Sequence, residues 1–302
     1  MDLFANLTAP DPDPRGWAQA REAEGYEGVS CSDHYVLSSA ARGMRPFPHL
    51  WVSLAAMACG TSRVRIMSAF ANNLFRSPVE FAQASLSLQS VSNGRFEAGL
   101  GAAWTKDELV RTGQEYPDGK VRARRLVEAL QIARSLMATG GVTFAGDHYQ
   151  VDLPPGAIGP APAAGPPPLV ASVGSPWTMR NVPPLVDRVE LKIGRSTREG
   201  ALDLGVLGTV TLDEVRAMVD TVRTAAPDVP VSAFVLTAAG DAPEVEGMRR
   251  TLGGNLLGSV CGEPKRVLEN LLALEELGLD ALLLTEWTPG TYTALAEARQ
   301  SL

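Results

Sequence analysis

The stretch 64–104 constrains the fold more than any other part of this chain. Residues 64–68 (VRIMS) are apolar and β-prone, and Ser77-Pro78 then begins a helix with a capping residue and a proline at its first position. Ser92-Asn93-Gly94 ends that helix, and a second strand leads into Gly99-Leu100-Gly101. A strand–helix–strand unit with glycines just past its second strand is a site-building unit of a parallel sheet.

The rest of the chain repeats this alternation. Further strands are expected at 3–8, 27–31, 169–172, 188–192, 231–236 and 281–285. Further helices are expected at 17–25, 47–60, 121–138, 212–225, 243–257, 264–277 and 291–299, with a short one from 105, a hairpin at 141–151 and a proline-rich surface excursion at 152–168. Strands alternating with helices over 302 residues predict one domain, 1–302: a single (β/α)8 TIM barrel with insertions at its C-terminal mouth.

Composition excludes several classes of function. The net charge of −7 and a pI near 5.1 argue against nucleic acid or an anionic membrane as a partner. No apolar run approaches the roughly 18 residues of a membrane span, and residues 1–15 lack the features of a secretory signal. Cys31, Cys59 and Cys261 are scattered, and the three histidines lack metal-ligand spacing. We therefore expect no metal site and a reduced, cytoplasmic compartment.

Candidate site residues follow from the place where TIM barrels have their active sites. Such sites lie at the carboxyl ends of the strands. The residues selected in this way are Asp33, His34, Ser68, Ala69, Phe70, Asn72, Gly101, Ala102, Trp104, Val173, Gly174, Ser175, Lys192, Arg195 and Glu286.

Two groups among these residues suggest chemistry. His34 is the only imidazole at a strand end, and an ordinary histidine pKa near 6.5 suits proton transfer; Asp33 is a candidate to orient it. The alternative is a polar loop pair bonded to backbone. Gly174-Ser175 opens a short helix whose free N–H groups could bind phosphate, with Lys192 and Arg195 close by to neutralise it. The alternative there is a helix cap and two solvated cations.

Three motifs together resemble a known family. Ser77-Pro78-Val79, Asn93-Gly94-Arg95-Phe96 and Gly99-Leu100-Gly101-Ala102-Ala103-Trp104 are similar, in content and spacing, to a phrase of the bacterial luciferase-like oxidoreductases. The phrase Val142-Thr143-Phe144 before a tyrosine agrees as well. The resemblance implies a TIM barrel and a flavin or deazaflavin cofactor, and it implies no substrate. Ser32-Asp33-His34 resembles the motif of deazaflavin-dependent members, in which the histidine lies beside the cofactor ring and serves in proton transfer.

The resemblance also assigns roles to residues. It implies a non-proline cis peptide between Ala69 and Phe70, next to Ser68, in a bulge under the cofactor ring. It places the cofactor phosphate on the two loops that carry Val173-Gly174-Ser175 and Lys192 to Arg195. It also makes Trp104 a wall of the substrate pocket. By their strand-end positions alone, Gly101 and Ala102 are assigned to the cofactor, and Asn72 and Glu286 to the substrate pocket. Arg76 and Arg95 are interpreted as structural.

Three functions stay open on this basis. The favoured one is hydride transfer between coenzyme F420 and a small organic substrate; the alternatives are an FMNH₂- and oxygen-dependent monooxygenase and a non-catalytic barrel. Trp104 replaces the acidic residue that the sugar-phosphate dehydrogenase branch usually has after its glycines, so that reaction is not expected. The Ala, Gly, Pro and Arg content suggests a high-GC actinobacterial genome and a place in secondary metabolism. The apolar helix segment 51–58 predicts a homodimer.

Overall fold

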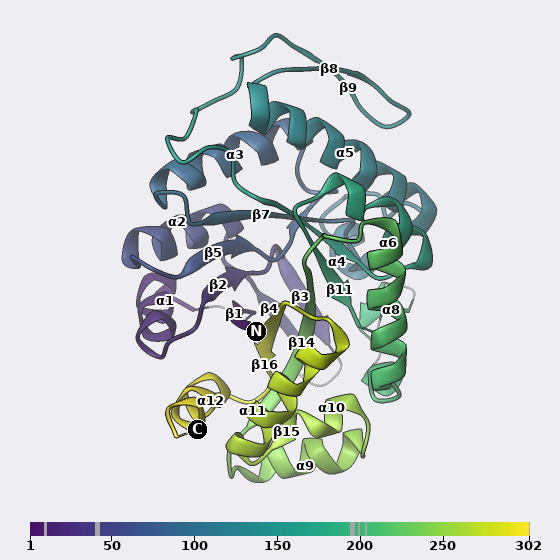
Figure 1. Ribbon diagram of the computed structural model, residues 1–302. Helices are drawn as coiled ribbons and strands as arrows, with labels where there is room; N and C mark the ends of the chain where they lie inside the picture. The colour runs from purple at the N-terminus through teal and green to yellow at the C-terminus, as the bar shows by residue number, and fades with distance from the viewer. Residues whose placement is uncertain (9–10, 40–42, 194–196, 199, 203, 302) are drawn as a thin grey trace.

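The chain closes into a parallel β-barrel (Figure 1). The structure is a computed structural model that describes residues 1–8, 11–39, 43–193, 197–198, 200–202 and 204–301. Within this part of the chain, eight parallel strands form the barrel: β1 (Asp2–Leu7), β2 (Gly28–Cys31), β5 (Arg65–Ser68), β7 (Phe96–Gly101), β10 (Leu169–Val173), β11 (Arg188–Lys192), β14 (Val231–Ala239) and β16 (Ala281–Glu286). Strand β16 pairs with both β14 and β1, and β7 pairs with β10, so the eight strands form a closed circle, which confirms the predicted (β/α)8 TIM barrel.

Helices surround the barrel and connect its strands (Figure 1). The longer ones are α1 (Pro14–Ala23), α2 (Leu50–Gly60), α3 (Pro78–Val91), α5 (Gly119–Thr139), α8 (Leu212–Ala225), α9 (Pro243–Leu252), α11 (Pro264–Ala273) and α12 (Thr291–Gln300). The shorter ones are α4 (Lys106–Arg111), α6 (Pro176–Asn181), α7 (Leu204–Leu207), α10 (Leu256–Ser259) and the 3₁₀ turns η1 (Pro183–Leu185) and η2 (Leu274–Leu277). Among the described residues, no helix combines the length and apolarity that crossing a membrane requires.

The predicted N-cap of α3 is confirmed, whereas one predicted helix is split. The Ser77 hydroxyl accepts the backbone N–H of Glu80 at 3.1 Å. The helix expected at 243–257 ends at Leu252 and resumes as α10, because Gly253 takes a φ of +69° that a helix cannot continue through.

Most additions to the barrel follow its strands and therefore lie at the carboxyl mouth. These are β3 (Val36–Ser39), β4 (Gly43–Pro46), β6 (Ala71–Asn72), β12 (Thr197–Arg198), β13 (Ala201–Leu202) and β15 (Cys261–Gly262). The predicted hairpin, β8 (Val142–Ala145) with β9 (Gln150–Leu153), differs because it follows a helix. It folds back along α5, where the Glu128 carboxylate accepts the backbone N–H groups of residues 147–149. This insertion is therefore anchored on a helix rather than at a strand end.

Charged residues fill the amino end of the barrel axis. Arg65 pairs with Asp2 and Glu97, and Glu97 also pairs with Arg188. Above them lies a small apolar cluster that includes Phe4. This end is thus closed by side chains, which leaves the opposite, carboxyl end as the mouth.

The three cysteines differ in exposure, and this gives a first testable prediction. Burial raises the pKa of the Cys31 thiol to about 12 and that of Cys261 to about 11, whereas Cys59 is exposed on α2. Only the thiolate is the nucleophile, so the two buried thiols stay unreactive at pH 8. Alkylation of the folded protein with iodoacetamide should label Cys59 alone, and all three should react in guanidinium chloride. Equally fast labelling of Cys31 in the folded protein would contradict this packing.

Candidate active site

His34 follows β2 and is held in a fixed environment at the barrel mouth. Its Nδ1 lies 2.8 Å from the Oε2 of Glu108, which comes from α4. The rings of Phe47 and Trp104 meet the imidazole edge-on, with centroids 5.2 and 5.7 Å away. The structure thus brings together two predicted residues, His34 and Trp104, with two that the sequence did not indicate.

Glu108 fixes the orientation of His34. The carboxylate is 1% exposed, and its Oε1 accepts the backbone N–H groups of Tyr35 and Val36 at 2.6 and 3.1 Å. With Nδ1 directed at a carboxylate, the proton of the neutral imidazole resides on Nδ1. Nε2 is then left to accept or donate a proton at a bound molecule.

Asp33, the predicted partner of His34, points elsewhere. Its carboxylate takes two hydrogen bonds from the Arg76 guanidinium, at 2.9 and 3.0 Å, and one from the backbone N–H of Asn72 at 2.8 Å. Adjacent residues of extended chain direct their side chains to opposite sides, which separates Asp33 from His34. Asp33 and Arg76 therefore tie the loop after β5 to the end of β2, and the expectation that Asp33 orients His34 is corrected.

Asn72 also shapes this loop. Its side-chain Oδ1 accepts the backbone N–H of Leu74 at 2.9 Å, and the residue is 6% exposed. Asn72 thus forms a turn in the loop after β5, and its substrate-pocket role stays a prediction.

The glycines after β7 make room for the bulge after β5. The peptide bond between Ala69 and Phe70 is cis, as expected. The Ser68 hydroxyl accepts the N–H of Gly99 at 2.8 Å and donates to its carbonyl at 2.9 Å. A Cβ on Gly99 would lie 2.0 Å from the Ser68 carbonyl oxygen, and one on Gly101 would lie 3.1 Å from the Phe70 Cβ. This close approach requires glycine at position 99 and leaves little room for a side chain at position 101.

A second prediction follows from that approach. Gly99→Ala should destabilise the protein by about 1–3 kcal/mol or more, because the new methyl group meets backbone that has little room to move. Gly247→Ala in α9, where a Cβ meets nothing within 4 Å, is the matched control and should be neutral or mildly stabilising. Urea unfolding measures both. Equal stability of the Gly99 variant and the parent would refute the close approach.

Lys192 ends β11 and directs its side chain into the barrel at the mouth, and the phosphate role expected for it stays a prediction. Its ammonium donates to the Oε1 of Glu190 at 3.2 Å and faces the rings of Phe70 and Phe234, with centroids 4.9 and 4.3 Å away. Glu190 is fully buried and also accepts from the Ser232 hydroxyl. Burial raises the pKa of Glu190, while the charges of Lys192 and Arg188 oppose that rise. Glu190 and Phe234 are further site residues that position alone did not select.

The other predicted phosphate groups are already engaged or lie outside the described residues. The N–H groups of Gly174 and Ser175 both donate to the Thr178 hydroxyl, at 3.3 and 3.1 Å, and Ser175 caps α6. Val173 is buried in the main core. Arg195 lies outside the described part of the chain. The helix cap named as the alternative is therefore present, and the role of this loop in holding a cofactor phosphate stays a prediction.

Glu286 ends β16, and one of its carboxylate oxygens is buried without a hydrogen-bond partner among the described residues. Burial raises the pKa of its carboxyl group, and hydrogen bonds from the N–H groups of Tyr292 and Thr291, at the start of α12, act against that rise. The preceding Thr285 bonds to Asn6, which in turn accepts from Ser30 of the neighbouring strand. Because strand residues alternate between the two faces, Glu286 faces the helices when Thr285 faces the interior. This orientation does not support the substrate-pocket assignment of Glu286, which stays a prediction.

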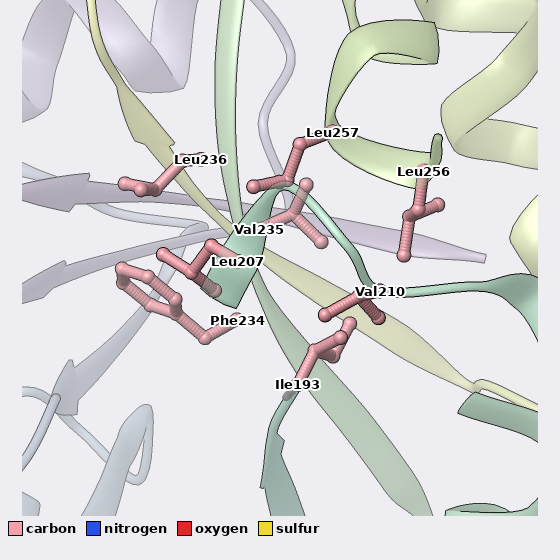
Figure 2. Close-up of a pocket in the computed structure, with 8 residues that line it drawn as sticks. All are labelled: Ile193, Leu207, Val210, Phe234, Val235, Leu236, Leu256 and Leu257. Carbon is pink, nitrogen blue, oxygen red and sulfur yellow. The ribbon is translucent and has the colours of Figure 1, made fainter. Parts of the chain in front are cut away.

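A small apolar cavity lies beside β14, as Figure 2 shows. Its volume is about 10 Å³, which is room for a single water molecule at most. The side chains around it are Ile193, Leu207, Val210, Phe234, Val235, Leu236, Leu256 and Leu257. The residues around it are all apolar. Ala102 lies half-buried just past Gly101.

The fold and these residues define a TIM-barrel protein with its candidate site at the carboxyl mouth. Residues 12–245 match the model of the luciferase-like monooxygenase family. The chain belongs to this family.

Curated relatives match over part of their length. The F420-dependent glucose-6-phosphate dehydrogenase of Amycolatopsis mediterranei is 32% identical over 136 residues, which cover 45% of this chain and 40% of that protein. The enzyme of the same name from Gordonia bronchialis is 32% identical over 154 residues, 49% of this chain and 45% of that protein. The chain thus matches less than half the length of these relatives.

Solved structures match over nearly the whole chain. An F420-dependent secondary alcohol dehydrogenase in complex with an F420–acetone adduct aligns with a TM-score of 0.76 at 19% identity, covering 98% of this chain and 97% of that one. A coenzyme F420 dependent tetrahydromethanopterin reductase from Methanopyrus kandleri aligns with a TM-score of 0.72 at 14% identity, covering 100% and 98%. At such identities the likeness shows the fold alone.

Proposed function

We propose that this protein is an F420-dependent oxidoreductase that transfers a hydride to or from a small organic substrate at the barrel mouth. The proposal rests on the placement of His34. Its Nδ1 lies 2.8 Å from the Glu108 carboxylate, and its ring contacts the rings of Phe47 and Trp104. A hydride transfer at a carbon–oxygen bond needs a partner that moves the accompanying proton. His34 has the geometry for that task, and relatives and structural neighbours named as F420-dependent agree with it.

The residues at the mouth fit a flat conjugated ring. Phe70 and Trp104 are aromatic side chains that follow β5 and β7, and Gly99 and Gly101 clear the space in which Phe70 sits. F420, when bound, would supply or accept the hydride. His34 would donate or accept a proton at the substrate oxygen through Nε2, while Glu108 holds Nδ1–H and stabilises the imidazolium. Phe47 and Trp104 would keep water from the imidazole.

The second candidate is an FMNH₂- and oxygen-dependent monooxygenase, which the description of the matched family favours. Parallel titrations with F420 and FMN in both redox states, followed by product analysis under labelled oxygen, separate the two. Tight binding of F420 and a product without oxygen-18 support hydride transfer. Tight FMNH₂ binding with oxygen-18 in the product would replace it by oxygenation. Binding of neither cofactor would leave a non-catalytic barrel.

The substrate proposed is a small organic molecule other than a sugar phosphate. Trp104 stands where the sugar-phosphate branch is expected to have its acidic residue, and it packs against His34. We also propose a role in secondary metabolism and a location in the cytoplasm. Activity measured with a panel of purified substrates addresses the metabolic role.

The homodimer also remains a prediction. Helix α2 buries Leu50, Leu54 and Met57 inside the subunit, while Val52 is 68% exposed. The exposed apolar side of α2 is the expected contact. Light scattering at micromolar concentration should give about twice the chain mass of 32.0 kDa, and a mass equal to one chain would exclude a stable dimer.

A further inference from the structure

The inner face of β11 carries charges at every second residue. Arg188, Glu190 and Lys192 all point into the barrel, because strand residues two apart share a face. Arg188 pairs with Glu97 at the closed end, and Glu190 pairs with Lys192 towards the mouth. The axis of the barrel thus holds a column of opposite charges whose mouth-facing end is an ammonium group.

The exposure of the upper pair is unequal. The Glu190 side chain is 0% exposed, whereas that of Lys192 is 35% exposed. An ammonium has three donors, and Glu190 is the acceptor that the described residues provide for it. Lys192 is therefore held from below by a buried carboxylate while it keeps hydrogen-bonding capacity on the mouth side.

Two aromatic rings define what kind of molecule fits above this ammonium. The Lys192 ammonium nitrogen lies over the rings of Phe70 and Phe234, 4.9 and 4.3 Å from their centroids, in two cation–π contacts. Phe234 also borders the small apolar cavity of Figure 2, next to Leu236. A cation with apolar walls on two sides suits a ligand that combines an anionic oxygen with a flat, apolar body.

We propose that Lys192, positioned by Glu190 and flanked by Phe70 and Phe234, binds the anionic oxygen of an aromatic or conjugated organic anion at the floor of the barrel mouth. This deepens the proposed function by naming the chemistry of a ligand at the same mouth. The anion is either a substrate carboxylate or phenolate, or a negatively charged oxygen of the cofactor ring.

Benzoate is the probe, and benzamide is its neutral control of the same shape. Calorimetric titration of the full-length protein should show benzoate binding at least tenfold more tightly than benzamide, as a charge-assisted hydrogen bond is worth about tenfold or more. Lys192→Met and Lys192→Gln should both remove that preference. Both variants remove the charge, and the glutamine keeps a polar group next to Glu190. Thermal unfolding of each variant shows whether the fold persists, which separates loss of charge from misfolding. Lys265→Met, at an exposed position of α11, is the matched control and should retain the preference for benzoate.

The Glu190→Gln variant tests whether Lys192 binds an anion, because a purely structural ion pair predicts no gain in benzoate affinity. Removing the carboxylate charge leaves Lys192 uncompensated, so benzoate should bind about threefold or more tightly. If benzoate and benzamide bind the parent equally, or if Lys192→Met leaves benzoate affinity unchanged, the proposal fails. A competition with F420 and with FMN then assigns the source. Mutual exclusion marks the anion as part of the cofactor, and simultaneous binding marks it as substrate.

This experiment is independent of catalysis. Benzoate binding that depends on Lys192, in a protein that binds neither F420 nor FMN, would support the anion site and refute the proposed oxidoreductase. Tight F420 binding without any preference for benzoate would do the reverse.

Discussion

Replacing His34 by glutamine is expected to lower kcat by about 10²–10⁴-fold, the usual contribution of a positioned general acid or base. The assay is reduction of F420 by whichever alcohol in a substrate panel proves active. Glutamine keeps polarity and approximate size but cannot carry the proton. The His34 ring packs between Phe47 and Trp104, so thermal unfolding should be recorded to show that the fold persists.

Glu108 acts through His34, and this makes the test sharper. Glu108→Gln alone should give a smaller loss than His34→Gln. The double variant should lose no more activity than His34→Gln alone, because residues that act as a unit are not additive. His148→Gln, on the β8–β9 hairpin, is the matched control and should keep full activity. Additive losses in the double variant would show that Glu108 has a separate task.

Replacing Asp33 by asparagine is expected to destabilise the protein by about 3–5 kcal/mol, because it leaves the Arg76 guanidinium without its buried counter-charge. Asp33 and Arg76 are 3% and 10% exposed, and three hydrogen bonds converge on the carboxylate. Exposed ion pairs contribute much less to the free energy of unfolding. Asp107→Asn, which breaks the exposed pair with Arg111, is the matched control and should change stability by about 1 kcal/mol at most.

Urea unfolding of the two variants decides between the roles considered for Asp33. A large loss of stability for Asp33→Asn agrees with a structural carboxylate that anchors the loop after β5. If Asp33→Asn lowers the free energy of unfolding by less than about 1 kcal/mol but greatly lowers kcat, Asp33 is instead a catalytic residue. The contrast with His34→Gln, which should affect kcat far more than stability, separates the two neighbours.

The fold was predictable because the barrel depends on patterns that are local in sequence. The strands at 188–192 and 281–285 and the helix at 212–225 are marked by apolar runs, caps and glycine stops, and the structure places them where these signals indicate. The break between α9 and α10 was not predicted, because the pattern is helical on both sides of the two consecutive glycines that interrupt it. Tertiary contacts of α10 near β14 stabilise the split.

The site was predictable only in part, because its pairs come from distant segments. Nothing local distinguishes Glu108 from Asp107, since both stand in the first turn of the same short helix. Their difference arises when α4 folds over the end of β2. Glu190 did carry a signal: a strand buried on both faces with charges at every second position must pair those charges inside. The same alternation rule, applied to β16, would have placed Glu286 outside the barrel.

A crystal structure of the complex with F420 tests the central claim most directly. The account predicts that the ring occupies the carboxyl mouth and leaves a space for the substrate oxygen within hydrogen-bonding reach of the His34 Nε2, about 2.6–3.2 Å or one water away. In that complex, the His34 Nδ1 should still contact Glu108. A cofactor bound away from the mouth, or an imidazole whose Nε2 faces the protein interior, would contradict the account.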